Sequence, residues 1–211
     1  MNNAHEFDRQ YAARQLHRSR NILRRSIKYF YINNILRDVR GPTIDFGCGA
    51  GQLLSRLPAG SVGLELNPAL VAALLSTGLN ARQCFFDENF LFSDFLAGHY
   101  KTFVMSHVLE HFDGAENILR KILRSCQRLE IERVIVVLPC ALGYRSDPTH
   151  KTFVNRHYLD QHELFACEGY TIKEASYFPI NVESAGNYFI FNELKLFYIR
   201  TKNAGLEHHV E

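Results

Sequence analysis

The pattern of hydrophobic and polar positions changes at about residue 41. From there to about residue 201, short apolar runs alternate with segments in which apolar residues recur every three or four positions. Runs of the first kind indicate strands and segments of the second kind indicate helices, so their alternation is typical of an α/β protein. We predict strands at 43–46, 61–66, 81–86, 102–106 and 133–138, and helices at 51–57, 68–76, 90–96, 115–128 and 158–167.

The last part of this region has a different arrangement. Two β-rich runs, 171–180 and 187–200, follow one another with no room for a helix between them. Strands joined in this way pair antiparallel, whereas strands separated by a helix pair in parallel. The chain is therefore predicted to form a mixed sheet flanked by helices, with an antiparallel pair at its edge.

Residues 1–40 carry a helical pattern of apolar positions, which predicts one or two amphipathic helices. They hold nine Lys or Arg against three acids, a charge of +6, which leaves −4 for the remainder of a chain whose net charge is +2. We predict a basic helical cap over residues 1–40, packed on a domain of residues 41–201, and a tail over 202–211. An excess of basic residues is typical of a solvated helix face. Two alternative roles are a clamp for an anionic substrate and a contact with nucleic acid.

Composition narrows the class of protein. The chain has 211 residues, 46% of them hydrophobic and 22% charged, as in ordinary globular proteins. Its longest apolar run, residues 134–142, is far shorter than the about 18 residues that a membrane helix needs. The first residues lack the features of a secretory signal, and the five cysteines form no Cys-x-x-Cys pair. We expect a cytoplasmic protein with reduced thiols and no membrane span, and the sequence leaves its oligomeric state open.

A glycine-rich segment, DFGCGAG at residues 45–51, follows the first predicted strand. At such a turn a bare backbone lets a ligand approach closely. The dinucleotide fingerprint would need a glycine where Gln52 or Leu54 stands, and no Gly-Lys-Ser/Thr of a phosphate loop follows. Glu65 ends the second predicted strand, where a carboxylate can accept the hydrogen bonds of a ribose diol. The spacing indicates a nucleoside-like ligand that carries an amino group and no phosphates.

At these residues the chain resembles the class I S-adenosylmethionine-dependent methyltransferases, whose first motif is apolar-acid-x-Gly-x-Gly-x-Gly and whose second strand ends in an acid. The stretch FVMSHVLEH at 103–111 is similar to the fourth-strand motif of the subgroup that methylates small molecules, quinones, lipids and sugars. The stretch SDPTHKTF at 146–153 is also similar to that subgroup. The resemblance covers about residues 40–200. It implies a Rossmann-like fold, with a seven-stranded mixed sheet in the order 3-2-1-4-5-7-6, and S-adenosylmethionine as cofactor.

The resemblance also implies a set of cofactor-binding residues. Asp87 departs from the family pattern because it lacks the usual preceding glycine, and residues 1–40 match no family motif, which leaves the methyl acceptor open. The implied cofactor-binding residues are Asp45, Gly47, Cys48, Gly49, Gly51, Glu65, Leu66, Asp87, Ser106 and His107.

Methyl transfer depends mainly on positioning, but a hydroxyl acceptor also needs a base. Ligands of open α/β sheets bind beyond the carboxyl ends of the strands, so the base is expected in those loops. His107 follows the fourth predicted strand and His150 follows the fifth, which makes both candidate catalytic residues. Each has an alternative role, His107 as a wall of the cofactor site and His150 as a hydrogen-bonding partner of Asp147 within its loop.

Other chemistries fit the sequence less well. Residues 107–111, HVLEH, match the H-x-x-E-H pattern of certain zinc proteases, but that pattern belongs on a long helix, so no metal site is predicted. The Asn/Asp-Pro-Pro-Tyr/Phe motif of enzymes that methylate base amino groups is missing, which makes nucleic acid an unexpected target. We expect a methyltransferase that acts on oxygen of a small metabolite, lipid or sugar. The alternatives are an RNA or protein methyltransferase that docks through the basic arm, and a regulatory module that binds S-adenosylmethionine without turnover.

Overall fold

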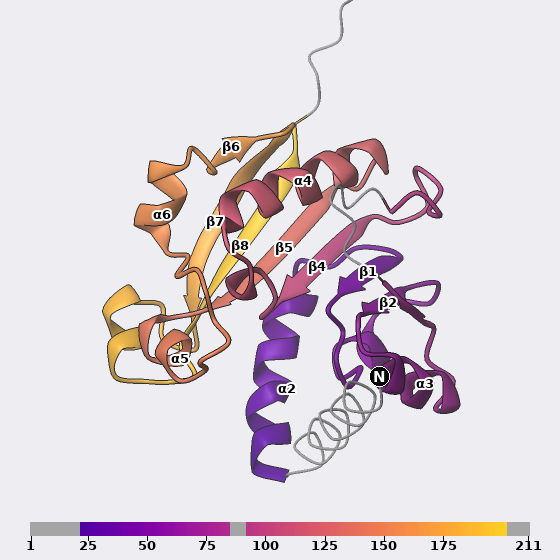
Figure 1. Cartoon of the computed structure of the whole chain (residues 1–211), viewed down its shortest axis with the longest axis horizontal. Coiled ribbons are helices and arrows are strands. Elements are labelled where there is room, and N and C mark those ends of the chain that lie inside the picture. The colour runs from indigo at the N-terminus through magenta and orange to yellow at the C-terminus, as the bar shows by residue number, and fades with distance from the viewer. Residues whose placement is uncertain (1–21, 85–91, 202–211) are drawn as a thin grey trace, which may run out of the picture.

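The computed structural model describes residues 22–84 and 92–201, and its centre is a single mixed sheet (Figure 1). The strand order is β3-β2-β1-β4-β5-β8-β7-β6. Neighbouring strands from β3 to β5 pair in parallel, whereas β8, β7 and β6 each pair antiparallel. The strands are β1 Thr43–Phe46, β2 Val62–Glu65, β3 Ala81–Gln83, β4 Thr102–Ser106, β5 Arg133–Pro139, β6 Ala166–Cys167, β7 Tyr170–Phe178 and β8 Glu193–Arg200.

The helix that follows β2 begins where the sequence places a cap. The Asn67 side chain accepts hydrogen bonds from the backbone N–H groups of Ala69 and Leu70, and Pro68 occupies the first turn, as expected at a helix start. The α-helices are α2 Ile22–Leu36, α3 Pro68–Ser76, α4 Ala115–Arg128, α5 Ala141–Arg145 and α6 Arg156–Gln161. The 3₁₀ helices are η1 Leu54–Arg56, η2 Leu109–His111 and η3 Glu183–Asn187. Among the described residues no helix is both long and apolar enough to cross a membrane.

The predicted fold class and strand order are confirmed, with one addition. Seven strands follow the order 3-2-1-4-5-7-6, and the two-residue strand β6 lies beyond them as an eighth. The prediction of a helix over 158–167 is wrong in its second half, because α6 ends at Gln161 and Ala166–Cys167 is β6. Glu168 and Gly169 join β6 to β7 with φ angles of 52° and 77°, the left-handed conformation that a tight two-residue hairpin requires.

Several other predicted elements are shorter than expected, among them the strand predicted over 81–86, which ends at Gln83. The helix predicted over 51–57 is reduced to the 3₁₀ turn η1. In the described part of the helix predicted over 90–96 the backbone forms turns, since Phe92 has a φ of 45° that a right-handed helix cannot contain. The last strand is expected over 187–200 but begins at Glu193. The residues before it belong to the end of η3 and to the turns that follow it. Strand β8 also lies inside the sheet, between β5 and β7.

Both faces of the sheet are buried. Alternate residues of β5 point to opposite sides: Val136 packs with the apolar side of α4, which crosses one face in Figure 1, and Ile135 packs with the end of α2 on the other. The buried Lys195 ammonium of β8 lies 2.7 Å from Asp38 Oδ2 and so fixes the chain just after α2 to the sheet. This packing brings the carboxyl ends of β1, β4 and β5 to one edge, where the segments that follow them meet.

Candidate functional site

The glycine loop after β1 combines tight packing with an open backbone. Gly47 and Gly51 have φ angles of 74° and 72°, and a Cβ atom on Gly47 would lie only 2.3 Å from Val108 Cγ2. Gly49 also has a positive φ, 52°, but a Cβ atom there would meet nothing within 4 Å. The outer glycines therefore allow the loop to pack, whereas the middle glycine leaves its backbone facing open space.

Glu65 connects the end of β2 to this loop. The Gly49 N–H donates to Glu65 Oε2 and the Asn67 N–H donates to Glu65 Oε1, both at 2.9 Å. Each carboxylate oxygen has two lone pairs, so each can still accept a further hydrogen bond. Leu66, the next residue, is 48% exposed and offers an apolar surface beside this carboxylate.

Asp45 lies under the loop with unused hydrogen-bonding capacity. Its side chain is buried, 3% exposed, and its Oδ2 has no hydrogen-bond partner among the described residues. Burial, aided by the negative charge of Glu65, raises the pKa of Asp45 to about 7, although a backbone hydrogen bond from Leu54 opposes the rise. Burial also raises the pKa of the nearby Cys48 thiol, which is therefore neutral. The loop thus contains a buried acceptor that suits a donor group of a ligand.

The remaining residues predicted to bind cofactor are placed as follows. Ser106 is the half-buried last residue of β4, next to the segment that packs on the glycine loop. Asp87 lies outside the described residues. The assignment of these side chains to a cofactor stays a prediction.

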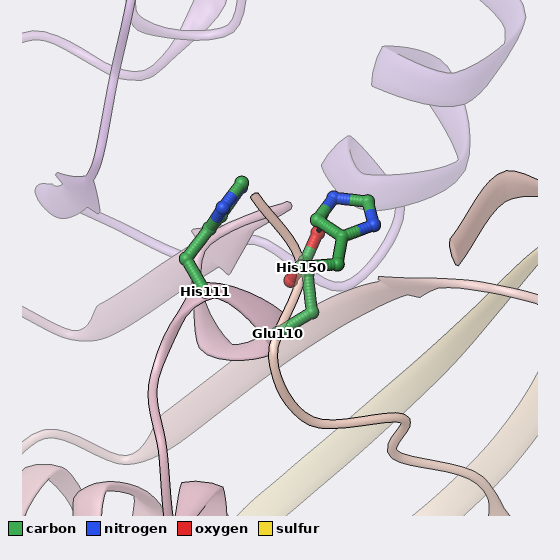
Figure 2. A group of neighbouring side chains, drawn as sticks. All are labelled: Glu110, His111 and His150. Carbon is green, nitrogen blue, oxygen red and sulfur yellow. Dashed lines mark ion pairs between the residues drawn. The ribbon is translucent and has the colours of Figure 1, made fainter. Parts of the chain in front are cut away.

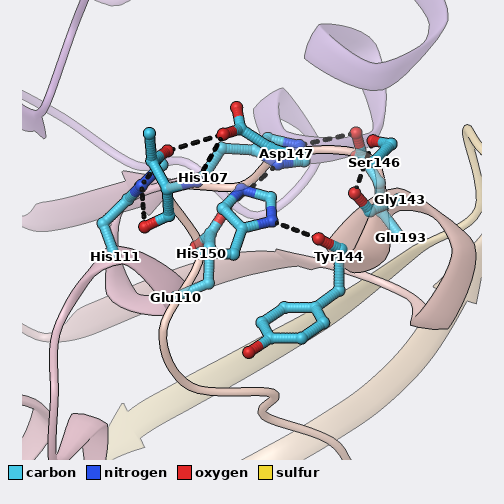
Figure 3. Close-up of polar contacts among 10 residues, drawn as sticks. His107, Glu110, His111, Gly143, Tyr144, Ser146, Asp147, His150 and Glu193 are labelled. Atoms are coloured by element: carbon cyan, nitrogen blue, oxygen red, sulfur yellow. Dashed lines mark hydrogen bonds and ion pairs between the residues drawn. The ribbon is translucent and has the colours of Figure 1, made fainter.

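His107 lies between two carboxylates (Figure 3). Its Nε2 is 2.7 Å from Glu193 Oε1 and its Nδ1 is 3.4 Å from Glu110 Oε1. Desolvation lowers the pKa of His107, but the negative charges of Glu193 and Glu110 outweigh it and raise the pKa to about 10. The imidazole is therefore protonated at neutral pH and cannot accept a proton in this arrangement.

His150 is held by the loop that follows α5. Its ring stacks on Tyr144 at 5.4 Å between centroids, and its Nδ1 lies 2.8 Å from the Tyr144 carbonyl oxygen. The Asp147 side chain instead accepts hydrogen bonds from the N–H and hydroxyl of Thr149. The expected bond between His150 and Asp147 exists only between backbone atoms, from the His150 N–H to the Asp147 carbonyl at 3.2 Å.

The structure adds two acids that the sequence reasoning missed. Glu110 is 1% exposed and lies close to both His107 and His150. It stood within the segment at 107–111 and could have been singled out there. Glu193 lies 86 residues from His107, so no local signal links the two.

A cavity of about 400 Å³ opens at the carboxyl end of β5. It does not include the glycine loop, but it lies at the edge of the sheet where ligands of open α/β proteins bind. Its size falls in the range of small-molecule sites. Residues that line it include Cys140, Phe153, Asn155, Tyr177, Glu183 and Leu194.

Comparison with known proteins gives one family and many similar folds. The sequence profile of a family described as methionine biosynthesis protein MetW matches residues 27–145. A search of curated proteins found no match.

Three solved structures illustrate the similarity of fold. A SAM-dependent methyltransferase from Archaeoglobus fulgidus has a TM-score of 0.60 at 15% identity, over 82% of this chain and 94% of that one. A putative methyltransferase in complex with the Trm112 activator of Haloferax volcanii has a TM-score of 0.65 at 14% identity, over 92% and 98%. Magnesium protoporphyrin IX methyltransferase from Synechocystis PCC 6803, with bound SAH, has a TM-score of 0.54 at 17% identity, over 86% and 88%. The chain thus has the class I methyltransferase fold.

Proposed function

Because the chain belongs to the family described as methionine biosynthesis protein MetW, and has the class I methyltransferase fold, we propose that it binds S-adenosylmethionine and methylates an oxygen of a small metabolite, lipid or sugar. The observation that carries this proposal is the buried Asp45 Oδ2 without a partner among the described residues, beneath an open glycine backbone and beside Glu65.

Three residues of the glycine loop and of the end of β2 are proposed to bind separate groups of the cofactor. Glu65 has free lone pairs for the ribose hydroxyls, and Gly49 allows the backbone to come close to the ligand. Asp45 offers an unpaired acceptor to the amino group, whose positive charge would favour its ionised form. The sulfonium supplies an electrophilic methyl group, and the protein supplies position and orientation.

The acceptor is proposed to bind at the carboxyl end of β5, where the cavity of about 400 Å³ has a size that suits a small molecule. Methyl transfer would break the bond from methyl carbon to sulfur, with its electron pair kept by sulfur, and form a bond from carbon to the acceptor oxygen, whose proton would pass to water. His107 is protonated and His150 is directed toward Glu110. An acidic oxygen, as in a phenol or a carboxylic acid, is therefore the favoured acceptor, because it needs little help from a base.

The cofactor assignment is tested by calorimetric titration of the full chain with S-adenosylmethionine and its demethylated product. Glu65→Ala should weaken binding about 10- to 150-fold, since a hydrogen bond to a charged group typically contributes about 1.5–3 kcal/mol. Glu132→Ala removes an exposed acid far from the loop and serves as the control. An unchanged affinity in Glu65→Ala would exclude Glu65 from the site.

One observation favours a second function, a module that binds S-adenosylmethionine without turnover. The ion pair of His107 Nε2 with Glu193 Oε1, at 2.7 Å, favours the protonated imidazole and so removes one of the two predicted bases from the carboxyl end of β4. Incubation of the protein with methyl-labelled cofactor and a panel of phenols and carboxylic acids separates the two functions. Label transferred to an acceptor supports the enzyme, and reduced transfer in His150→Ala would identify that residue as part of the machinery. Tight binding without transfer to any acceptor supports the module.

A further inference from the structure

Three metal-ligating side chains converge next to the proposed cofactor site. Glu110 and His111 come from the segment after β4, and His150 comes from the loop after α5. One ligand atom of each residue lies within 4.8 Å of those of the other two. Figure 2 shows the three side chains extending to the same side of the two loops.

The Glu110 carboxylate is buried but not satisfied. Neither of its oxygens has a hydrogen-bond partner among the described residues, and the side chain is 1% exposed. The nearest histidine nitrogens to Oε1 are His107 Nδ1 at 3.4 Å and His150 Nε2 at 3.8 Å. The Glu110 carbonyl accepts hydrogen bonds from the N–H groups of Lys151 and Thr152, which fixes the two loops together. A buried carboxylate without hydrogen bonds is costly. The protonated His107 is shared with Glu193, which it contacts more closely, so Glu110 has room for a second cationic partner.

The tautomer of His150 leaves a lone pair directed at this carboxylate. The Tyr144 carbonyl can only accept, so His150 Nδ1 carries the hydrogen of their 2.8 Å contact. In the neutral ring Nε2 is then an acceptor that faces Glu110 Oε1 at 3.8 Å. Two acceptors that share a metal at about 2.0–2.2 Å stand roughly 3–3.5 Å apart. His150 Nε2 and Glu110 Oε1 therefore need to move only slightly closer together to bind the same ion.

His111 is also held by a hydrogen bond to one of its ring nitrogens. Its Nδ1 lies 3.1 Å from Thr149 Oγ1, and that hydroxyl donates its hydrogen to Asp147 Oδ1 at 2.6 Å. Thr149 Oγ1 therefore accepts from His111 Nδ1. In the neutral ring the other nitrogen then keeps its lone pair. Metal-binding histidines are usually held by such a hydrogen bond on the second nitrogen.

We propose that Glu110, His111 and His150 bind a divalent transition-metal ion, with zinc or cobalt as representative ions and at least one coordination position open. Two imidazoles and one carboxylate suit such ions, whereas magnesium and calcium prefer oxygen ligands alone. The site differs from the protease pattern, because its third ligand comes from a separate loop and His107 pairs with Glu193 instead.

The metal site lies where its open coordination position could bind the methyl acceptor. Val108, between His107 and the ligands, packs against Gly47 of the glycine loop, so the metal would lie next to the proposed cofactor site. A metal there can bind an acceptor oxygen and make it more acidic. This role rests on the proposed methyl transfer, whereas metal binding itself does not.

The test uses the full chain, purified without a tag, stripped with a chelator and dialysed. Titration with Co²⁺ followed by visible absorption, and with Zn²⁺ and Mg²⁺ by calorimetry, should show one transition-metal ion per chain and weaker binding of Mg²⁺. Glu110→Gln, His111→Gln and His150→Gln should each reduce the affinity for Co²⁺ at least tenfold and alter the absorption band. His157→Gln, at an exposed position of α6, is the matched control.

A second control replaces His208 and His209 with alanine, since adjacent histidines can bind metal by themselves. Circular dichroism confirms that each variant is folded, and His111→Gln carries the test if Glu110→Gln does not fold. The proposal is overturned if the folded chain binds no transition metal, if it prefers Mg²⁺, or if the cluster variants bind as the wild type does. The metal titration needs no cofactor, so its failure leaves the S-adenosylmethionine assignment to be judged by the Glu65→Ala experiment.

Discussion

At the scale of single residues, the feature that suits Asp45 to a ligand also lowers the stability of the free protein. A buried carboxyl with an acceptor oxygen that lacks a partner is stable only when protonated, which is why its pKa is raised to about 7. In the unfolded chain an aspartate ionises near pH 4, so the folded state holds an extra proton between about pH 4 and pH 7. Stability from this group is therefore fully present below about pH 4 and is lost as the pH rises to about 7.

Asp45→Asn removes this loss, because the amide is neutral at every pH. We expect the variant to be more stable than the wild type at pH 8, by between about 1 and 4 kcal/mol, and the difference to shrink toward pH 4. Urea denaturation of both proteins at a series of pH values measures it. The same variant should bind S-adenosylmethionine more weakly, since it loses the negative charge offered to the amino group. A difference in stability that is constant with pH would contradict the raised pKa.

At the scale of elements, the glycine loop and the segment after β4 are built to fit one another. Gly47 and Val108 come from the ends of neighbouring parallel strands, and the absent Cβ of Gly47 leaves room for the valine side chain. This contact sets the distance between the proposed cofactor loop and the segment that carries His107, Glu110 and His111.

Gly47→Ala and Gly49→Ala separate backbone strain from packing. Both positions have a positive φ, but only the Cβ at Gly47 meets Val108. We expect Gly49→Ala to cost about 1 kcal/mol and Gly47→Ala about 2–4 kcal/mol in urea denaturation. Adding Val108→Ala should recover part of the loss in Gly47→Ala and none of it in Gly49→Ala. Equal losses in the two single variants would show that the contact with Val108 does not matter.

At the scale of the whole molecule, the charge is divided between the N-terminal arm and the remainder. The described end of the arm packs on the sheet through Ile35 and Val39, and Asp38 pairs with the buried Lys195. The prediction of a cap over residues 1–40 stays a prediction, since residues 1–21 lie outside the described part of the chain. The excess of basic residues at 1–40 leaves a role in binding RNA to be tested.

We expect only non-specific attraction of nucleic acid to this arm. Binding of a labelled RNA oligonucleotide, followed by fluorescence anisotropy, should be weak and should be lost between about 50 and 200 mM salt. Substitution of Arg37 and Arg40 by Gln should reduce it without changing the affinity for S-adenosylmethionine. Tight, saturable binding that persists at about 200 mM salt would favour the RNA methyltransferase instead.

The amino-acid sequence alone determined the α/β fold, because alternation, helical periodicity and the glycines act over a few neighbouring residues. Strands β1 and β4 and helices α3 and α4 have the predicted bounds, and the glycine loop with Glu65 lies where expected. Tertiary structure determined that turns replace the helix expected after Phe92 and that Ala166–Cys167 forms the added strand β6. It also determined the protonation and the partners of the histidines. The protonation of His107 depends on Glu193, and the cluster around Glu110 depends on His150 from another loop. Burial and charge at these positions arise only when distant segments meet, so no local pattern could have revealed them.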